Sequence, residues 1–323
     1  MNEKWKAADI PSLTGKRVII TGANSGIGYH AALKLARKGA EVVLACRDRQ
    51  RGEEALARLH ADSPGTQTEL AILDLASLSS VRDFAKKELA QQRPLHMLIN
   101  NAGVMAPPRR LQTADGFELQ FGTNVLGHFV LTALLMPALE RAGAGSPDRP
   151  RVVTIASIAH KRGRINFDDL QSTKIYSPMK AYQQSKLANL ILAFELDRRL
   201  RAADSRVMSV AAHPGVASTN LFQAGDYSAF ERAVRNLVAH AIGIVLNTDA
   251  EGALPTLYAA TAPGAEDGGY YGPQGFQEMS GDDVGEAIVA PQARDATAAG
   301  RVWQICEELT GVPFLSTAGS VSR

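Results

Sequence analysis

The segment TGANSGIG at residues 21–28 constrains the fold of this chain more strongly than any other feature. It follows a short β-type run at 17–20 and leads into apolar residues at helical spacing. A glycine-bearing turn from a strand into a helix presents backbone amides to a bound anion, so the segment is a candidate for a loop that binds dinucleotide phosphates. Such a turn is common on its own, and its meaning depends on the motifs downstream.

The three glycines of this segment have separate expected roles. Gly22 allows a sharp turn, Gly26 lets the backbone approach a pyrophosphate, and Gly28 lets the new helix pack closely on the sheet. The spacing TGxxxGxG differs from the GxGxxG of other dinucleotide-binding loops.

Composition places the chain among ordinary globular proteins and excludes disordered and fibrous classes. Of its 323 residues, 45% are hydrophobic and 21% are charged, and a net charge of +2 gives no footprint for nucleic acid. Cys46 and Cys306 are the two cysteines, and their separation predicts neither a disulfide framework nor a metal site. The N-terminal residues 1–13 lack an apolar signal region, and apolar runs such as 129–139 are too short to cross a bilayer. We therefore expect a soluble, cytoplasmic protein without an integral membrane segment.

Strand-like and helix-like segments alternate from residue 17 to about 214, which is the βαβ pattern of a parallel sheet covered on both faces. The expected strands lie near 17–22, 41–46, 68–73, 95–99, 151–156 and 206–212. The expected helices lie at 26–38, 49–61, 77–91, 117–141 and 180–203. We predict one α/β domain over 1–323, with a doubly wound parallel sheet of about seven strands.

The pattern changes after Pro214. The candidate elements there are helices at 229–246, 250–261 and 292–310, the last ended by Gly311, and a short strand within GGYYGPQG at 268–275. We predict a substrate lid over 217–262 and a C-terminal extension over 292–323. The sequence leaves open whether 229–246 covers a pocket, joins a homo-oligomer contact or lies on a membrane surface.

A few polar residues in this framework could carry chemistry. Tyr182 and Lys186 stand four residues apart in a helix candidate, so they project from one face; a nearby ammonium favours the phenolate, which suits proton exchange with an alcohol. The pair alone is commonplace. Ser157 ends the strand RVVTIAS, at the sheet edge where ligands bind. Asn124 is unfavourable inside its helix candidate, and together with Gly127 it indicates a local distortion.

Six motifs in a fixed order resemble those of the short-chain dehydrogenase/reductase family. They are TGANSGIG at 21–28, NNAG at 100–103, Asn124, Ser157, YQQSK at 182–186 and HPG at 213–215. The resemblance extends from residue 15 to about 220. The segments ACRD at 45–48, GRINFDDLQ at 163–171 and SKLANLILAFEL at 185–196 are similar to the retinol-dehydrogenase-like and protochlorophyllide-reductase-like branch.

The resemblance implies a single Rossmann-type oxidoreductase domain with a catalytic tetrad. Tyr182 would be the general acid in carbonyl reduction or the base in alcohol oxidation, and Ser157 would polarise the substrate oxygen. Lys186 would lower the Tyr182 pKa and hold the nicotinamide ribose. Asn124 would keep a helix kinked and bind a water that relays protons from Lys186.

The cofactor implied is NADP(H), favoured over NAD(H). NAD-using members carry an acidic residue at the end of the second strand, whereas Cys46 stands here, and Arg47 after it could pair with a 2′-phosphate. The implied cofactor-binding residues are Gly22, Asn24, Ser25, Gly26, Ile27, Gly28, Arg47, Asp74, Leu75, Asn101, Ala102, Gly103, Tyr182, Lys186, Pro214, Gly215, Val216 and Thr219.

The function expected is interconversion of a small hydrophobic carbonyl compound and its alcohol, with substrate contacts from 160–178 and 217–250. Two alternatives stand beside it. The first is a non-catalytic NADP(H)-binding redox sensor or interaction protein. Such a protein would need no proton donor, so the presence of the tetrad argues against it. A sugar epimerase or dehydratase relative would share the YxxxK motif but predicts a GxxGxxG loop, which differs from 21–28.

Overall fold

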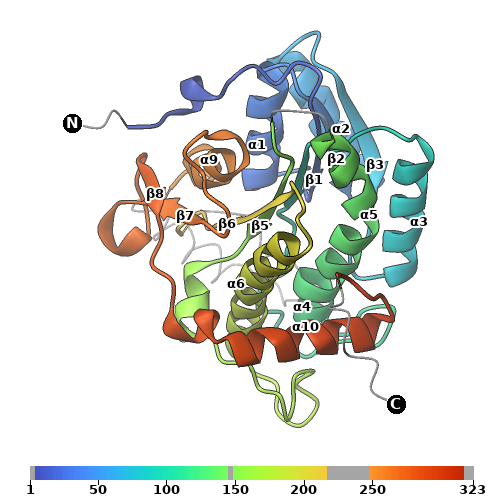
Figure 1. Ribbon diagram of the computed structural model, residues 1–323, viewed down its shortest axis with the longest axis vertical. Coiled ribbons are helices and arrows are strands. Elements are labelled where there is room, and N and C mark those ends of the chain that lie inside the picture. Colours follow the sequence, from blue (N-terminus) through green and yellow to red (C-terminus); the bar gives the residue numbers. More distant parts are fainter. Residues whose placement is uncertain (1–3, 145–147, 217–246, 316–323) are drawn as a thin grey trace.

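The computed structural model describes residues 4–144, 148–216 and 247–315. Its centre is a sheet with the strand order β3-β2-β1-β4-β5-β6-β7-β8, in which every neighbouring pair is parallel except β7 and β8 (Figure 1). The strands are β1 (Arg17–Thr21), β2 (Glu41–Cys46), β3 (Thr68–Ile72), β4 (Met97–Asn100), β5 (Arg151–Ile155), β6 (Met208–Ala212), β7 (Tyr270–Pro273) and β8 (Val284–Glu286). The predicted α/β fold with a doubly wound sheet is confirmed.

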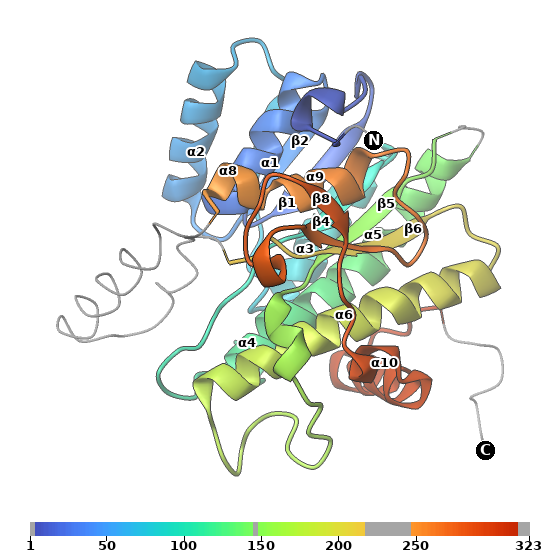
Figure 2. The same ribbon diagram turned by 90° about the vertical axis from the view of Figure 1, so that its left-hand side faces the viewer.

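Helices cover both faces of this sheet (Figures 1 and 2). They are α1 (Gly26–Arg37), α2 (Arg49–Asp62), α3 (Leu78–Ala90), α4 (Leu119–Phe121), α5 (Gly127–Gly143), α6 (Pro178–Ala202), α8 (Asp249–Gly252), α9 (Leu254–Thr261) and α10 (Ala296–Thr310). One hydrophobic core joins α1, α2 and α9 to the sheet, and a second joins α3, α5, α6 and α10 to its other face.

Strand β1 shows why the sequence gives this layered packing. Val18, Ile19 and Ile20 are fully buried, yet Val18 and Ile20 belong to one core and Ile19 to the other. Successive side chains of a strand point to opposite faces, so a strand covered on both sides needs a continuous apolar run. The same constraint explains the apolar run of β6.

The chain order of the strands reverses between β1 and β4, because β2 and β3 lie on one side of β1 and the later strands on the other. In open α/β sheets the crevice beyond the carboxyl ends of the strands at this switch point is where ligands bind. The loop at residues 21–28 leaves β1 there.

One strand was not expected. The predicted segment at 268–275 does form the short strand β7, but β8 adds an eighth strand where about seven were predicted. It has three residues, Val284–Glu286, and its antiparallel pairing with Tyr271–Pro273 fixes it. So short a segment carries no readable periodicity, because its pairing partner rather than its own pattern determines it.

The predicted distortion around Asn124 and Gly127 is confirmed. Residues Gly122–Leu126 form a π turn between α4 and α5, in which the Gly127 amide donates to the Gly122 carbonyl five residues back. Among the described residues one helix is long and apolar enough to cross a membrane, Leu119–Gly143, and 83% of its apolar window is buried in the fold. The core helix of a globular protein passes the same test of length and composition, so the expectation that the chain has no integral membrane segment stays a prediction.

Part of the predicted C-terminal extension forms helix α10, which packs against the layer of helices on one face of the sheet. Helix α10 packs across α6 (Figure 2), and its Trp303 is 1% exposed and stacks on Phe314. Gly311 ends α10 with a left-handed φ of 65°, as the sequence predicted.

Most of the predicted lid over 217–262, including the helix at 229–246, lies outside the described residues. Its described end is α8 and α9. Helix α9 packs on β5, β6 and β7, with Leu257 fully buried, so this described end belongs to the core, and the lid over the rest of the segment stays a prediction.

Candidate active site

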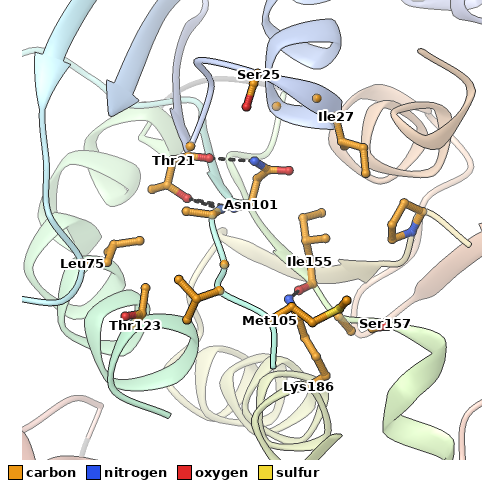
Figure 3. A pocket seen from close by; sticks show the side chains of 18 of the residues that line it. Thr21, Ser25, Ile27, Leu75, Asn101, Met105, Thr123, Ile155, Ser157 and Lys186 are labelled. Atoms are coloured by element: carbon orange, nitrogen blue, oxygen red, sulfur yellow. Dashed lines mark hydrogen bonds between the residues drawn. The ribbon is translucent and has the colours of Figure 1, made fainter. Parts of the chain in front are cut away.

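A pocket of about 480 Å³ opens at the carboxyl ends of the strands (Figure 3). In Figure 3, Ser25 and Ile27 lie on one side, Leu75 and Thr123 on another, and Ser157 with Lys186 at a third. The pocket thus joins the loop at 21–28, called the phosphate loop below, to the proposed chemical residues.

The glycines of the phosphate loop allow close contacts that a side chain would prevent. A Cβ on Gly28 would lie 2.6 Å from Asn101 Nδ2, and one on Gly22, whose φ is +67°, would lie 3.0 Å from the Ala102 Cα. Thr21 Oγ1 accepts hydrogen bonds from the amides of Asn101 and Ala102, both at 2.9 Å. The NNAG motif and the phosphate loop therefore form one rigid unit.

Two arginines and an aspartate lie where the pocket meets the end of β2. Arg47 and Arg51 both line the pocket, and Asp48 caps α2 by accepting from the Arg51 amide at 2.9 Å. Cys46 is buried, and burial raises the pKa of its thiol to about 12. Sequence reasoning missed Arg51, although its position four residues after Arg47 was a usable signal.

Thr123 is a second residue that sequence reasoning missed. It lies beside Leu75 at the pocket wall (Figure 3), is 8% exposed, and its hydroxyl has no hydrogen-bond partner within the described residues. A buried polar group without a partner is costly, so this hydroxyl is available to a ligand in the pocket.

Three members of the expected tetrad meet at the other end. Ser157 directly follows β5, and Tyr182 and Lys186 project from α6; all three line the pocket. The Ser157 hydroxyl lies close enough to the Tyr182 phenol to lower its pKa. Lys186 Nζ donates to the Ile155 carbonyl at 2.9 Å and lies 6.0 Å from the centre of the Tyr182 ring.

Burial dominates the electrostatics of this pair. Tyr182 is 6% exposed and Lys186 is 3% exposed. Burial raises the pKa of Tyr182 to about 12, partly offset by the nearby Ser157 hydroxyl, and lowers the pKa of Lys186 to about 8. The Tyr182 pKa is therefore raised and not lowered, because burial penalises the ionised phenol, and the lowering by Lys186 that the sequence led us to expect is not seen in this structure.

Asn124 stands behind the pocket wall and does not line it. Its side-chain Oδ1 accepts from the Val104 amide at 2.8 Å, and Nδ2 donates to the Val104 carbonyl and to Ser185 Oγ, both at 3.0 Å. The amide therefore ties the chain after NNAG to helix α6, which carries Tyr182.

All other predicted site residues that are described line this one pocket. Thr219 lies outside the described residues. The pocket also includes residues that the sequence did not single out, Thr21, Ala45, Asp48, Arg51, Leu73, Val104, Met105, Thr123, Ile155, Ala156, Ile158, Ala159 and Met179. The segment 160–178, expected to contact substrate, borders the pocket only through its neighbours Ala159 and Met179.

Comparisons with known proteins identify the family. A family model described as short chain dehydrogenase matches residues 16–227. The chain belongs to the short-chain dehydrogenase/reductase family. This short-chain dehydrogenase/reductase is 41% identical to human retinol dehydrogenase 12 over 302 residues, covering 93% of this chain and 88% of that protein. It is also 41% identical to mouse polyprenol dehydrogenase over 303 residues, covering 94% of this chain and 86% of the relative.

Solved structures support the same family. A protein from Mycobacterium paratuberculosis that is described as uncharacterised matches this short-chain dehydrogenase/reductase with a TM-score of 0.76 and 41% identity, over 97% of this chain and 99% of that one. The NADP complex of Pseudomonas aeruginosa RhlG matches with a TM-score of 0.59 and 25% identity, over 80% and 94% of the two chains. The protein is thus an oxidoreductase related to retinol and polyprenol dehydrogenases.

Proposed function

We propose that the protein interconverts a hydrophobic carbonyl compound and its alcohol with NADP(H), and that Tyr182 is the general acid and base. The observation that carries this proposal is that Ser157, Tyr182 and the buried Lys186 line the same pocket, with Tyr182 and Lys186 one helical turn apart on α6. A redox sensor without catalysis would have no use for this buried set of proton-exchanging groups.

The residues present fit a nicotinamide dinucleotide. The amino end of α1 faces the pocket, and no side chain of the described residues caps its first amides, which are therefore available to a pyrophosphate. When bound, the cofactor supplies or accepts the hydride. Arg47 and Arg51 are the residues that would hold a 2′-phosphate.

The side chains have separate tasks at the substrate oxygen. With a pKa of about 12, Tyr182 is protonated at neutral pH and donates its proton when a carbonyl is reduced. The Ser157 hydroxyl orients the same oxygen and stabilises the charge that develops on it. The ammonium of Lys186 stabilises the phenolate that forms on Tyr182, because opposite charges attract strongly in a buried site.

The substrate class is inferred from the pocket lining and the relatives. Met105, Ile158 and Met179 give the reaction end an apolar wall, and the named relatives are a retinol and a polyprenol dehydrogenase. We expect NADPH oxidation with long-chain or isoprenoid aldehydes and ketones, and little with short polar ones. A spectrophotometric panel of both classes, with NADPH and NADH, tests this; turnover confined to polar carbonyls would contradict it. A cytoplasmic location and assembly into a homo-oligomer stay predictions.

Replacing Arg47 by alanine is expected to weaken NADPH binding about 10- to 100-fold and leave NADH binding within about twofold. The reason is the loss of one charge-assisted hydrogen bond, which typically contributes about 1.5–3 kcal/mol. Cofactor fluorescence titration gives both Kd values. Arg49→Ala is the matched control, because Arg49 lies two residues after Arg47, at the start of α2, but does not line the pocket. An equal loss for NADPH and NADH would exclude the phosphate role.

A further inference from the structure

His128, the second residue of α5, lies between two parts of the site that are far apart in the sequence. It is 6% exposed, and its ring Nε2 lies 2.9 Å from Thr21 Oγ1, at the start of the phosphate loop. Its Nδ1 lies 3.0 Å from the carbonyl oxygen of Asn124, within the π turn. None of the roles described so far uses this residue.

The partners determine which ring nitrogen carries the proton. The Asn124 carbonyl can only accept, so Nδ1 of His128 must donate. Burial lowers the pKa of His128 to about 4, which keeps the ring neutral at pH 7. Nε2 is then bare and accepts the proton of the Thr21 hydroxyl.

The remaining bonds of Thr21 agree with this assignment. Its Oγ1 accepts from the amides of Asn101 and Ala102 and so has one proton to give. The Ile99 carbonyl, at 3.4 Å, is a longer alternative than His128 at 2.9 Å. Donation to His128 therefore completes the hydrogen bonding of the Thr21 hydroxyl.

Beyond Asn124 the network reaches the helix that carries the proton donor. The Asn124 side chain donates to Ser185 Oγ at 3.0 Å, and Ser185 Oγ donates to the Tyr182 carbonyl at 2.8 Å. A buried series of hydrogen bonds thus runs from the phosphate loop through His128 and Asn124 to α6. If one member of a buried network is removed, the groups that were bonded to it are left without a partner.

We propose that His128 is a positioning residue that couples the nucleotide end of the pocket to the reaction end. Held between Thr21 and Asn124, its ring fixes the π turn and, through Ser185, the backbone that carries Tyr182. This inference rests on the proposed function, because the effect that we expect from the hydrogen bonds of His128 is a change in the rate of carbonyl reduction. A ring that merely filled space would be replaceable by phenylalanine without that consequence.

Three variants separate the two bonds of the ring. In His128→Asn the side-chain nitrogen reaches the place of Nδ1 and retains the bond to Asn124. In His128→Gln the amide reaches the place of Nε2 and retains the bond to Thr21. His128→Phe retains only the bulk. For each variant we would measure kcat, the KM of the carbonyl, the NADPH Kd and the melting temperature.

We expect kcat of His128→Phe to fall about 10-fold and its NADPH Kd to rise about fivefold, the effects of losing one ordinary hydrogen bond at each end. His128→Asn should keep kcat within about threefold of wild type, and His128→Gln should keep the NADPH Kd but lose kcat like His128→Phe. Equal losses in all three variants that follow the melting temperature would overturn the proposal. So would wild-type kcat and Kd in His128→Phe.

The ring proton provides a readout that needs no turnover. Nitrogen-15 NMR of the wild type at pH 7, with His128 assigned from the spectrum of His128→Asn, should show a neutral ring protonated at Nδ1. Protonation at Nε2 would contradict the network. If the wild type turns over no carbonyl, the proposed function fails. The inference about His128 can still be tested then, by the tautomer of the ring and by comparing the NADPH Kd of His128→Gln with that of His128→Phe.

Discussion

Replacing Tyr182 by phenylalanine is expected to lower kcat for carbonyl reduction about 10³-fold while changing the NADPH Kd less than about twofold. The substitution removes one oxygen and keeps the aromatic ring of a residue that is only 6% exposed. A positioned general acid typically contributes 10²- to 10⁴-fold to rate, and the loss here should be near the middle of that range. Steady-state kinetics and a cofactor titration measure the two quantities.

A matched control distinguishes this loss from a general effect of removing a tyrosine hydroxyl. Tyr258 lies on α9, away from the pocket, and Tyr258→Phe should keep kcat within about twofold. Comparable losses in both variants would show that the Tyr182 effect is structural. A Tyr182→Phe enzyme with near-normal kcat would instead require another proton donor.

Local patterns were sufficient to predict much of the fold and part of the site. The continuous apolar run of β1 indicated a strand buried on both faces, and the four-residue spacing of Tyr182 and Lys186 placed both on one face of α6. Asn124 and Gly127 indicated a local distortion, because asparagine is unfavourable inside a regular helix, and the structure shows that this distortion is a π turn. These are properties of short segments, which the chain encodes locally.

Other features depend on contacts between distant segments. The link between Thr21 and His128 joins residues 107 apart, and nothing in the sequence around either residue indicates that the two side chains meet. The direction of the Tyr182 pKa also required the structure, because the i, i+4 spacing reports a nearby cation but not the degree of burial. Strand β8 exists only because β7 offers it an edge.

The pH dependence of carbonyl reduction should follow the charge of Lys186. Burial lowers the pKa of Lys186 to about 8, so its ammonium is present below that pH and is lost as the pH rises through it. Tyr182 keeps its proton over the same range, because its pKa is about 12. We therefore expect kcat to fall as the pH rises above about 8, from loss of the cation rather than of the proton donor.

Replacing Lys186 by methionine should lower kcat at pH 7 about 100-fold and abolish that fall. The ammonium lies 6.0 Å from the Tyr182 ring centre, where a unit charge stabilises a phenolate by roughly 3 kcal/mol at an effective dielectric constant of about 20. That energy corresponds to about a 100-fold change in rate. Lys180→Met, on the same helix but away from the pocket, should retain both the rate and the pH profile. If Lys186→Met still loses activity above pH 8, another group titrates there and the cation is not what the transition state requires.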